Sequence, residues 1–166
     1  MARIGPDELS RWFDAHAGAM VLYARQWLDP AAAEDAVQEV FLRLVRTPPA
    51  PRHVRAWLFR AVRNTAINRL RSRRRRTHHE RTRADAGPAW FDARADDPVD
   101  PAAIQGALAR LPVEQREVVV LRTWAGMGFE EIAGTVGRPV STVFGWYRAA
   151  LTSLRATMRA SCNPTT

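Results

Sequence analysis

Apolar residues recur at the three- and four-residue spacing of an amphipathic helix on both sides of one Pro- and Asp-rich segment. No stretch alternates between apolar and polar residues as a β-strand does. The sequence therefore predicts an all-α fold with two small helical domains joined by a flexible acidic linker. We expect domains at 1–83 and 102–160, a linker at 84–101 and a tail at 161–166.

Three helices are predicted in the N-terminal domain: 7–28, 30–46 and about 53–72. Asp29-Pro30 is a strong start signal for the second, because Asp caps free N–H groups and Pro fits the first turn. TPPAP, at 47–51, is expected to be a loop. The apolar positions predicted to face the core are Leu9, Trp12, Phe13, Met20, Tyr23 and Trp27 in the first helix, and Ala33, Val37, Val40, Phe41 and Leu44 in the second.

Four helices are predicted in the C-terminal domain: 101–111, 112–123, 129–136 and 141–159. Gly137 permits a tight turn at 137–140, so the last two helices have the arrangement of a helix–turn–helix. Such a pair presents the N-terminal part of its second helix to the major groove of DNA, although any helical hairpin produces the same pattern. The predicted inner positions are Phe129, Ile132, Ala133 and Val136, followed by Val143, Tyr147, Ala150, Leu151 and Leu154.

Charge is distributed unevenly along the chain. Residues 52–83 hold twelve Arg against one acid, whereas 84–101 hold five Asp against one Arg. With a net charge of +8 and a pI near 11.3, the chain suits a polyanionic partner, either nucleic acid or an anionic membrane surface. There is no apolar run of 18 residues and no signal-peptide pattern, and the only cysteine, Cys162, permits no internal disulfide. We therefore expect a cytoplasmic protein without membrane insertion.

The third predicted helix has two distinct faces. Its apolar face carries Leu58, Phe59, Val62, Ala66 and Leu70. The opposite face carries Arg60, Asn64, Asn68 and Arg71, with Trp57 at its edge. Guanidinium, amide and aromatic groups suit phosphates, base edges and unstacked bases respectively. This face indicates nucleic-acid binding; the alternative is a solvated helix with a basic tail.

Catalytic chemistry has little support in the sequence. The four histidines, His16, His53, His78 and His79, form no Cys/His pattern for zinc. No phosphate-binding glycine loop and no Ser/His/Asp constellation is recognisable by spacing. We therefore expect no enzyme activity, cofactor, metal or small-molecule substrate.

Three ordered blocks carry a family resemblance. They are AEDAVQEVFLRLVR (33–46), VRAWLFRAVRNTAINRLRSRRRR (54–76) and ALARLPVEQREVVVLRTWAGMGFEEIAGTVGRPVSTVFGWYRAALTSLR (107–155). In order, spacing and total length they resemble the extracytoplasmic-function (ECF) sigma factors of the sigma-70 class, over about 7–160. The resemblance implies a protein that binds core RNA polymerase and directs promoter recognition, melting of the −10 element and transcription initiation.

Residue roles follow from the resemblance. Contacts with core polymerase are expected at Asp35, Gln38 and Glu39. Contacts with −10 DNA, including a flipped base near Arg52 and His53, are expected at Arg52, His53, Trp57, Arg60, Arg63, Asn64, Asn68, Arg71, Arg73, Arg74, Arg75 and Arg76. The last four would hold duplex backbone, or else form a disordered solvated end. Contacts with duplex −35 DNA are expected at Arg138, Ser141, Thr142, Phe144, Trp146 and Arg148.

Several alternatives stay open at this point. Phe144 and Trp146 would touch thymine methyls or pack against a protein. The linker acids Asp92, Asp96, Asp97 and Asp100 would act inside the polymerase or simply keep the linker soluble. The rival functions are a stand-alone helix–turn–helix regulator and a protein-interaction module that uses the aromatic C-terminal helix. An anti-sigma factor is a further hypothetical partner, because the chain has no sensory domain of its own.

Overall fold

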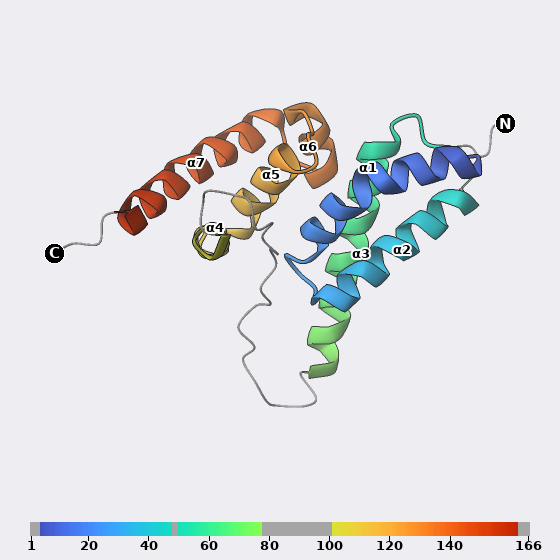
Figure 1. Ribbon diagram of the computed structural model, residues 1–166, viewed down its shortest axis with the longest axis horizontal. Coiled ribbons are helices and arrows are strands. Elements are labelled where there is room, and N and C mark those ends of the chain that lie inside the picture. The colour runs from blue at the N-terminus through green and yellow to red at the C-terminus, as the bar shows by residue number, and fades with distance from the viewer. Residues whose placement is uncertain (1–3, 48–49, 78–100, 163–166) are drawn as a thin grey trace. The chain divides into compact units, whose positions relative to one another are not determined.

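The computed structural model describes residues 4–47, 50–77 and 101–162 (Figure 1). These residues form seven helices and their connections, without a β-strand among them, so the all-α prediction is confirmed. The chain divides into two compact units, Met1–Pro88 and Ala89–Thr166. The predictions for the linker acids and for His78 and His79 lie outside the described residues.

The first unit is a bundle of three helices: α1 (Pro6–Ala24), α2 (Pro30–Arg46) and α3 (Val54–Thr77). Each helix contacts the other two. The core is apolar and aromatic, and the largest side chains in it are Tyr23, Phe59, Met20, Leu44 and Leu58. All five positions of α2 that were predicted to face inward are buried, as are Leu58, Phe59, Val62 and Ala66 of α3. Phe13 differs from the prediction, because 44% of it is exposed.

The first helix ends four residues earlier than its apolar spacing predicts. It stops at Ala24, and the N–H groups of Trp27 and Leu28 both bond to the Ala24 carbonyl, at 3.0 and 3.1 Å. Two local demands explain the early turn. Leu28 is buried, and Asp29 must be extended, with ψ at 164°, both because Pro30 follows it and because it caps α2. Its Oδ1 accepts from the Ala32 N–H at 2.9 Å, as the start signal predicts.

The third helix continues to Thr77, five residues past the predicted end. Arg is a good helix former, and cations in a last turn interact favourably with the partial negative charge at the C-terminus of a helix. Arg74, Arg75 and Arg76 occupy that last turn. The alternative of a disordered basic end is therefore wrong for residues 73–76.

The second unit contains α4 (Pro101–Ala109), α5 (Val113–Thr123), α6 (Phe129–Val136) and α7 (Val140–Cys162). The last helix contacts each of the other three. The buried core of the second unit includes Leu108, Val118, Leu121, Met127, Ile132, Val143 and Ala150. Helix α4 ends two residues before the predicted end, and the Leu111 N–H closes a turn on the Leu108 carbonyl ahead of Pro112.

Two glycines with positive φ shape the turns around α6. Gly126, at φ 63°, lies in the turn from α5, and Gly137, at φ 70°, ends α6 in the left-handed region. The N–H groups of Gly137 and Arg138 both bond to the Ala133 carbonyl, at 2.9 and 3.1 Å. Because L side chains rarely adopt this backbone conformation, Gly137 suits the predicted tight turn. The chain then enters α7, which completes a helix–turn–helix.

Candidate nucleic-acid and polymerase interface

The outward side of α3 carries a row of polar side chains. Arg60, Asn64, Asn68 and Arg71 recur at near-helical spacing, and all four are exposed. Leu58, Val62 and Ala66 on the opposite side are fully buried against the bundle. The packed side holds the helix, so the amides and guanidinium groups face solvent in a defined row. We call these four residues the polar row of α3.

The start of α3 adds groups beside this row. Arg52 and His53 are exposed immediately before the helix, and the His53 carbonyl accepts the Trp57 N–H at 3.0 Å. Trp57 and Arg63 are half-buried. The indole is thus held partly against the bundle while part of it stays accessible, which is the arrangement that stacking on an unpaired base requires.

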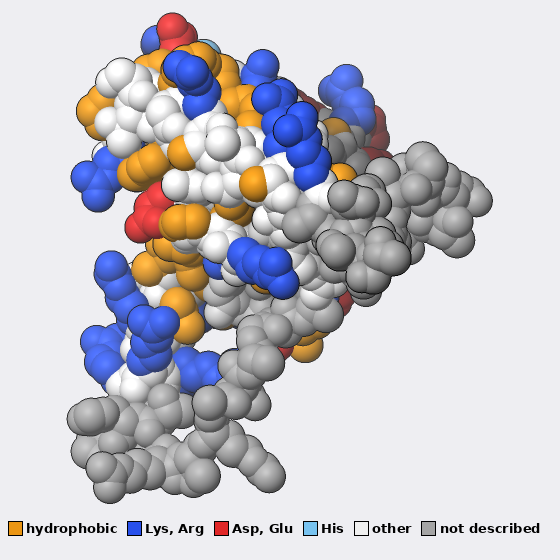
Figure 2. Space-filling model, turned by 90° about the vertical axis from the view of Figure 1, so that its left-hand side faces the viewer, with side chains coloured by type: hydrophobic (Ala, Val, Ile, Leu, Met, Phe, Trp, Pro, Cys, Tyr) orange, Lys and Arg blue, Asp and Glu red, His pale blue; other side chains and the backbone are white. Residues whose placement is uncertain are grey.

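The end of α3 is strongly basic. Arg71, Arg73, Arg74, Arg75 and Arg76 are all exposed, and basic side chains gather at the lower end of the surface in Figure 2, where α3 ends. Arg73 approaches Asp29 Oδ2 at 3.4 Å, and Arg75 donates to the Ser72 hydroxyl at 3.3 Å. The helix therefore concentrates positive charge within about two turns, which suits contacts with a phosphate backbone.

A stripe on α2 combines polar and apolar side chains. Asp35 and Gln38 are exposed, as predicted for a docking surface, and they continue along the helix into Leu42 and Val45. These two apolar residues are 58% and 42% exposed. Since the spacing of the four residues keeps them on one side of a helix, they form a single surface, which we call the α2 stripe. The sequence reasoning missed Leu42 and Val45, although their spacing from Gln38 was visible.

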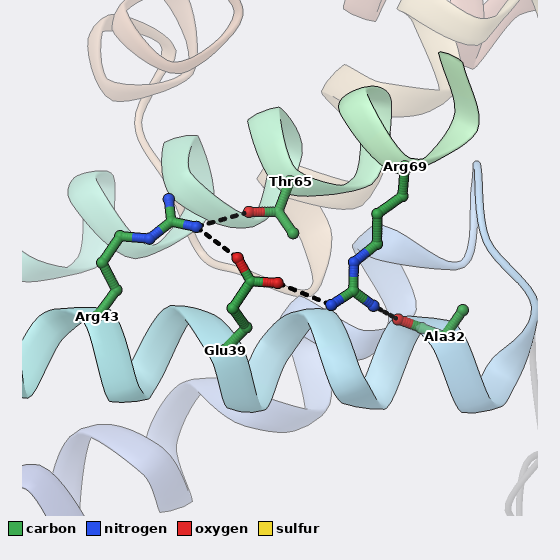
Figure 3. Close-up of polar contacts among 5 residues, drawn as sticks. All are labelled: Ala32, Glu39, Arg43, Thr65 and Arg69. Atoms are coloured by element: carbon green, nitrogen blue, oxygen red, sulfur yellow. Dashed lines mark hydrogen bonds and ion pairs between the residues drawn. The ribbon is translucent and has the colours of Figure 1, made fainter. Parts of the chain in front are cut away.

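Glu39 differs from Asp35 and Gln38. Figure 3 shows its carboxylate between two arginines: Oε1 accepts from Arg43 and Oε2 accepts from Arg69, each at 2.7 Å. The hydrogen bond from Arg69 is the main cause that lowers the pKa of Glu39, and the bond from Arg43 lowers it further against an opposing effect of burial. Glu39 is therefore a carboxylate engaged within the bundle, between α2 and α3.

The same arginines reach other groups. Arg69 also donates to the Ala32 carbonyl at 3.1 Å, and Arg43 donates to the Thr65 hydroxyl at 3.4 Å. We call Glu39, Arg43, Thr65 and Arg69 the α2–α3 clamp. The sequence reasoning missed Arg69; its signal was a charged residue three positions after the buried Ala66, on the flank of the apolar face.

His16 belongs to an aromatic cluster of the bundle. Its ring stacks on Trp12 with centroids 5.2 Å apart and meets the edge of Phe59 at 6.2 Å. Burial, and then the positive charge of Arg55, lower the pKa of His16. The imidazole thus takes part in the aromatic packing of the bundle. Among the described residues no group of three or more His, Cys, Asp or Glu is placed to hold a metal ion.

The N-terminal part of α7 carries the residues predicted for duplex DNA. Arg138, Ser141, Phe144 and Arg148 are exposed, whereas Thr142 and Trp146 are half-buried. The aromatic pair that the sequence suggested is therefore unequal, with Phe144 more open than Trp146. The exposed polar and cationic groups are suited to contacts with base edges and phosphates.

Phe144 also takes part in packing. The rings of Phe144 and of Phe129 in α6 lie edge to face with centroids 5.3 Å apart. The ring of Tyr147 lies 5.4 Å from that of Phe129, again between centroids. Arg122 of α5 lies over Phe129 at 5.0 Å and donates to the Met127 carbonyl at 2.9 Å. Phe129 thus joins α5, α6 and α7, and we call Phe129, Phe144, Tyr147 and Arg122 the Phe129 cluster. The sequence predicts Phe144 only as a contact residue, and its pattern does not single out Arg122.

Two family models match the two helical units. The model of sigma-70 region 2 matches residues 12–76, and that of sigma-70 region 4 matches residues 102–154. The ECF RNA polymerase sigma factor SigL of Mycobacterium tuberculosis is 34% identical over 157 residues, which cover 89% of this chain and 86% of that protein. The probable ECF RNA polymerase sigma factor SigI of the same species is 33% identical over 150 residues, covering 82% of this chain and 50% of that protein.

Two solved structures share the fold. The sigma factor RpoE, crystallised with the anti-sigma factor NepR from Bartonella quintana, matches with a TM-score of 0.73 at 20% identity, over 92% of this chain and 98% of that chain. CnrH, in complex with the cytosolic domain of CnrY, matches with a TM-score of 0.63 at 25% identity, over 94% and 90%. With both regions matched and a relative of this identity along most of its length, the chain belongs to the ECF sigma factors of the sigma-70 family.

Proposed function

We propose that this sigma factor binds core RNA polymerase through the α2 stripe, opens the −10 element on α3 and reads the −35 element with α7. The observation that carries the proposal is the polar row of α3: Arg60, Asn64, Asn68 and Arg71 are exposed along a helix whose opposite side is buried. Such a row can lie along one DNA strand while the backbone of α3 stays rigid. The chemistry of transcription belongs to the polymerase, so the chain is a non-enzymatic factor that acts in the cytoplasm without a cofactor.

The −10 element is engaged in three ways. Trp57, with Arg52 and His53 beside it, receives an unstacked base, and Asn64 and Asn68 bond to base edges of the opened strand. Stacking of a base on an aromatic ring contributes about 1–3 kcal/mol, which is comparable to the few kcal/mol that unstacking costs. Arg71 and Arg74 to Arg76 hold phosphates nearby, and their exposure at the end of α3 supports this role.

Polymerase docking uses charge and apolar surface together. Asp35 and Gln38 provide polar contacts, and Leu42 with Val45 provides the apolar part. An exposed apolar pair beside polar residues is typical of a protein interface. The exposure of the Asp35 carboxylate and of the Leu42 side chain, which is 58% exposed, supports this assignment.

The −35 element is read as duplex by the first turns of α7. Arg138 and Arg148 contact phosphates, and Ser141 and Thr142 reach base edges. Trp146 and the exposed edge of Phe144 touch thymine methyls. The exposure of Arg138, Ser141 and Arg148 at the start of the second helix of a helix–turn–helix supports this docking.

An anti-sigma factor is a further partner in this proposal. Both solved relatives are described in complexes, RpoE with an anti-sigma factor and CnrH with the cytosolic domain of CnrY. Affinity purification of the tagged chain from non-induced cells of its own host would recover a stoichiometric inhibitory protein. Recovery of the chain with core polymerase alone, under every growth condition, contradicts this part.

Run-off transcription with purified core polymerase tests the main proposal. We expect transcripts from the chain's own promoter, and permanganate-reactive thymines in its −10 region, only when core and sigma are both present. Replacing Trp57, Asn64 and Asn68 by Ala should abolish the reactivity while leaving binding to core intact. A matched control is Ala at the exposed Arg11 and Asp14 of α1, which lie outside the proposed site. Sequence-specific duplex binding by the chain alone, with no transcript, would instead indicate a stand-alone regulator.

A further inference from the structure

Ile67 is an apolar residue on the outward side of α3. It lies three residues after Asn64 and four before Arg71, so helical spacing places it within the polar row of α3. Val62 and Ala66, on the opposite side of the helix, are fully buried, whereas Ile67 is half-buried. Isoleucine is one of the residues most often found entirely inside a protein. Its side chain here lies outside the fully buried core of the bundle, among polar groups that we assign to DNA.

The groups around Ile67 are cations and amides. Arg60 and Arg71 lie before and after it on the same side of the helix, with Asn64 and Asn68 closer to it, and all four are exposed. Guanidinium groups suit phosphates, and amides suit base edges. The α2 stripe differs, because its apolar pair shares a surface with an acidic residue. An apolar side chain within a ring of cations and amides fits a nucleotide base, whose flat apolar face lies close to phosphates.

The two ends of α3 suit different forms of DNA. Trp57, near the start of the helix, suits an unstacked base, and the basic end at Arg74, Arg75 and Arg76 suits the phosphates of a duplex. Ile67 lies ten residues after Trp57 and seven before Arg74, which is about 15 Å and about 10 Å along the helix axis. In the proposed function, the boundary between opened strands and duplex therefore falls along the middle of α3, where Ile67 lies.

Strand opening leaves the last base pair of the duplex without a stacking partner on one side. Proteins that unstack or kink DNA frequently place an apolar side chain, isoleucine included, against such a base step. A β-branched side chain on a helix is held in one strongly preferred rotamer, so it loses little conformational freedom when it meets the base. The position, the apolar character and the stiffness of Ile67 therefore suit a contact at this boundary.

We propose that Ile67 contacts the base pair at the upstream edge of the opened −10 region and stabilises strand separation there. The contact is apolar and independent of sequence, whereas Asn64 and Asn68 bond to the base edges of the opened strand. This inference rests on the proposed function. Neither the family resemblance nor the two-faced pattern of α3 had assigned a role to Ile67.

A pair of substitutions with the same shape tests the apolar contact. Ile67→Val and Ile67→Thr both keep a β-branched side chain and have similar helix propensity, but only the first stays apolar. In holoenzyme with the full chain, at its own promoter, Ile67→Val should give close to the wild-type level of permanganate-reactive thymines. Ile67→Thr should lower the ratio of open to closed complex by about three- to tenfold, as expected when part of a buried apolar contact is lost.

A template with mismatched strands across the −10 region separates opening from base recognition. Because these strands are already apart, Ile67→Thr should support transcription from this template as well as the wild type does. Asn64→Ala and Asn68→Ala are the matched controls on the same helix, and they should stay defective, since the base edges must still be bound. Binding to core polymerase and the melting temperature of Ile67→Thr should match those of Ile67→Val, which would exclude docking and unfolding as causes.

Two results would overturn this role of Ile67. One is a wild-type fraction of open complex for Ile67→Thr on the duplex promoter. The other is an equal loss for Ile67→Thr on the duplex and the mismatched templates, which would assign Ile67 to packing or to base recognition. The proposed function fails in a different way, because Asn64→Ala and Asn68→Ala would then open and transcribe the duplex promoter as the wild type does.

Discussion

Phe144 offers the sharpest test of whether a residue of α7 reads DNA or holds the helix in place. Its ring packs edge to face on Phe129 at 5.3 Å, while 46% of the residue stays exposed. Replacing it with Ala removes the packed part of the ring. We expect this substitution to loosen the seating of α7 on α6, and so to weaken −35 binding even though other contact residues are unchanged.

The magnitude follows from burial. Truncating a fully buried Phe to Ala costs about 3–5 kcal/mol, so a residue that is 46% exposed should cost roughly half, about 1.5–2.5 kcal/mol. This range already includes loss of the ring–ring contact with Phe129. The free energy of unfolding of the C-terminal unit should therefore fall by about 1.5–2.5 kcal/mol, which for a domain of this size lowers its melting temperature by roughly 10 °C.

Amide hydrogen exchange of the full chain measures the stability of the C-terminal unit separately from that of the N-terminal unit. Amides of α5 to α7 should lose protection in Phe144→Ala, while those of α1 to α3 keep theirs. Phe144→Leu should recover most of the protection, and Val140→Ala, at a residue 43% exposed on the same helix, should change little. If Phe144→Ala leaves exchange unchanged and still abolishes −35 binding, the ring acts only as a DNA contact and the packing argument is wrong.

Four further predictions concern other parts of the molecule. Arg122→Met should lower the hydrogen-exchange protection of amides around the α5–α6 turn by about 1 kcal/mol, because it removes the 2.9 Å bond to the Met127 carbonyl. Arg122→Lys should lose less protection. Equal losses in the two variants would contradict this explanation. Because the pKa of His16 is lowered in the folded chain, its contribution to stability is complete above about pH 6.5 and is lost as the pH falls through the folded value. Urea unfolding between roughly pH 7.5 and 5 should thus show a smaller acid loss in His16→Phe than in the wild type. Replacing Arg74, Arg75 and Arg76 by Gln should reduce the slope of log affinity against log salt by about 0.7–0.9 for each phosphate that these arginines neutralise, and equally for all promoter sequences. Leu42→Ser should weaken binding to core polymerase without lowering the melting temperature, because the side chain is 58% exposed; an equal loss of stability would show that it packs within the bundle.

Burial was predictable at positions with a strong helical period, because residues on one face of a helix share one environment, either buried or exposed. Every apolar position of α2 that was expected to face inward is buried, and the polar row of α3 is exposed. Phe13 shows the limit of this reasoning. Its spacing marks the apolar side of α1, but its exposure depends on how far the facing helix covers it, and it meets Phe41 with centroids 5.0 Å apart while 44% of it stays open.

The clamp was not predictable because its partners are distant in sequence. The contact of Glu39 with Arg43 follows from their four-residue spacing on one helix, whereas Arg69 is 30 residues from Glu39. That pairing depends on the register of two antiparallel helices, which no local pattern specifies. The resemblance to sigma factors predicts Glu39 as a contact with core polymerase, but it does not reveal which neighbour its carboxylate contacts within the bundle.

The same register divides the basic block of the sequence into two groups. Arg69 and Arg73 face acidic side chains at Glu39 and Asp29, at 2.7 and 3.4 Å, and so part of their charge serves the bundle. The second group, Arg71 with Arg74 to Arg76, stands exposed toward the end of α3 and lies outside the clamp. Counting every arginine of the block as a phosphate contact would thus overestimate the salt dependence of promoter binding. Neutralising the whole block would also remove the contacts of Arg69 and Arg73 with α2, so a loss of promoter binding in such a variant could come from the bundle as well. Substitutions at Arg71 and Arg76 leave the contacts with Glu39 and Asp29 in place, so they report more directly on phosphate contacts.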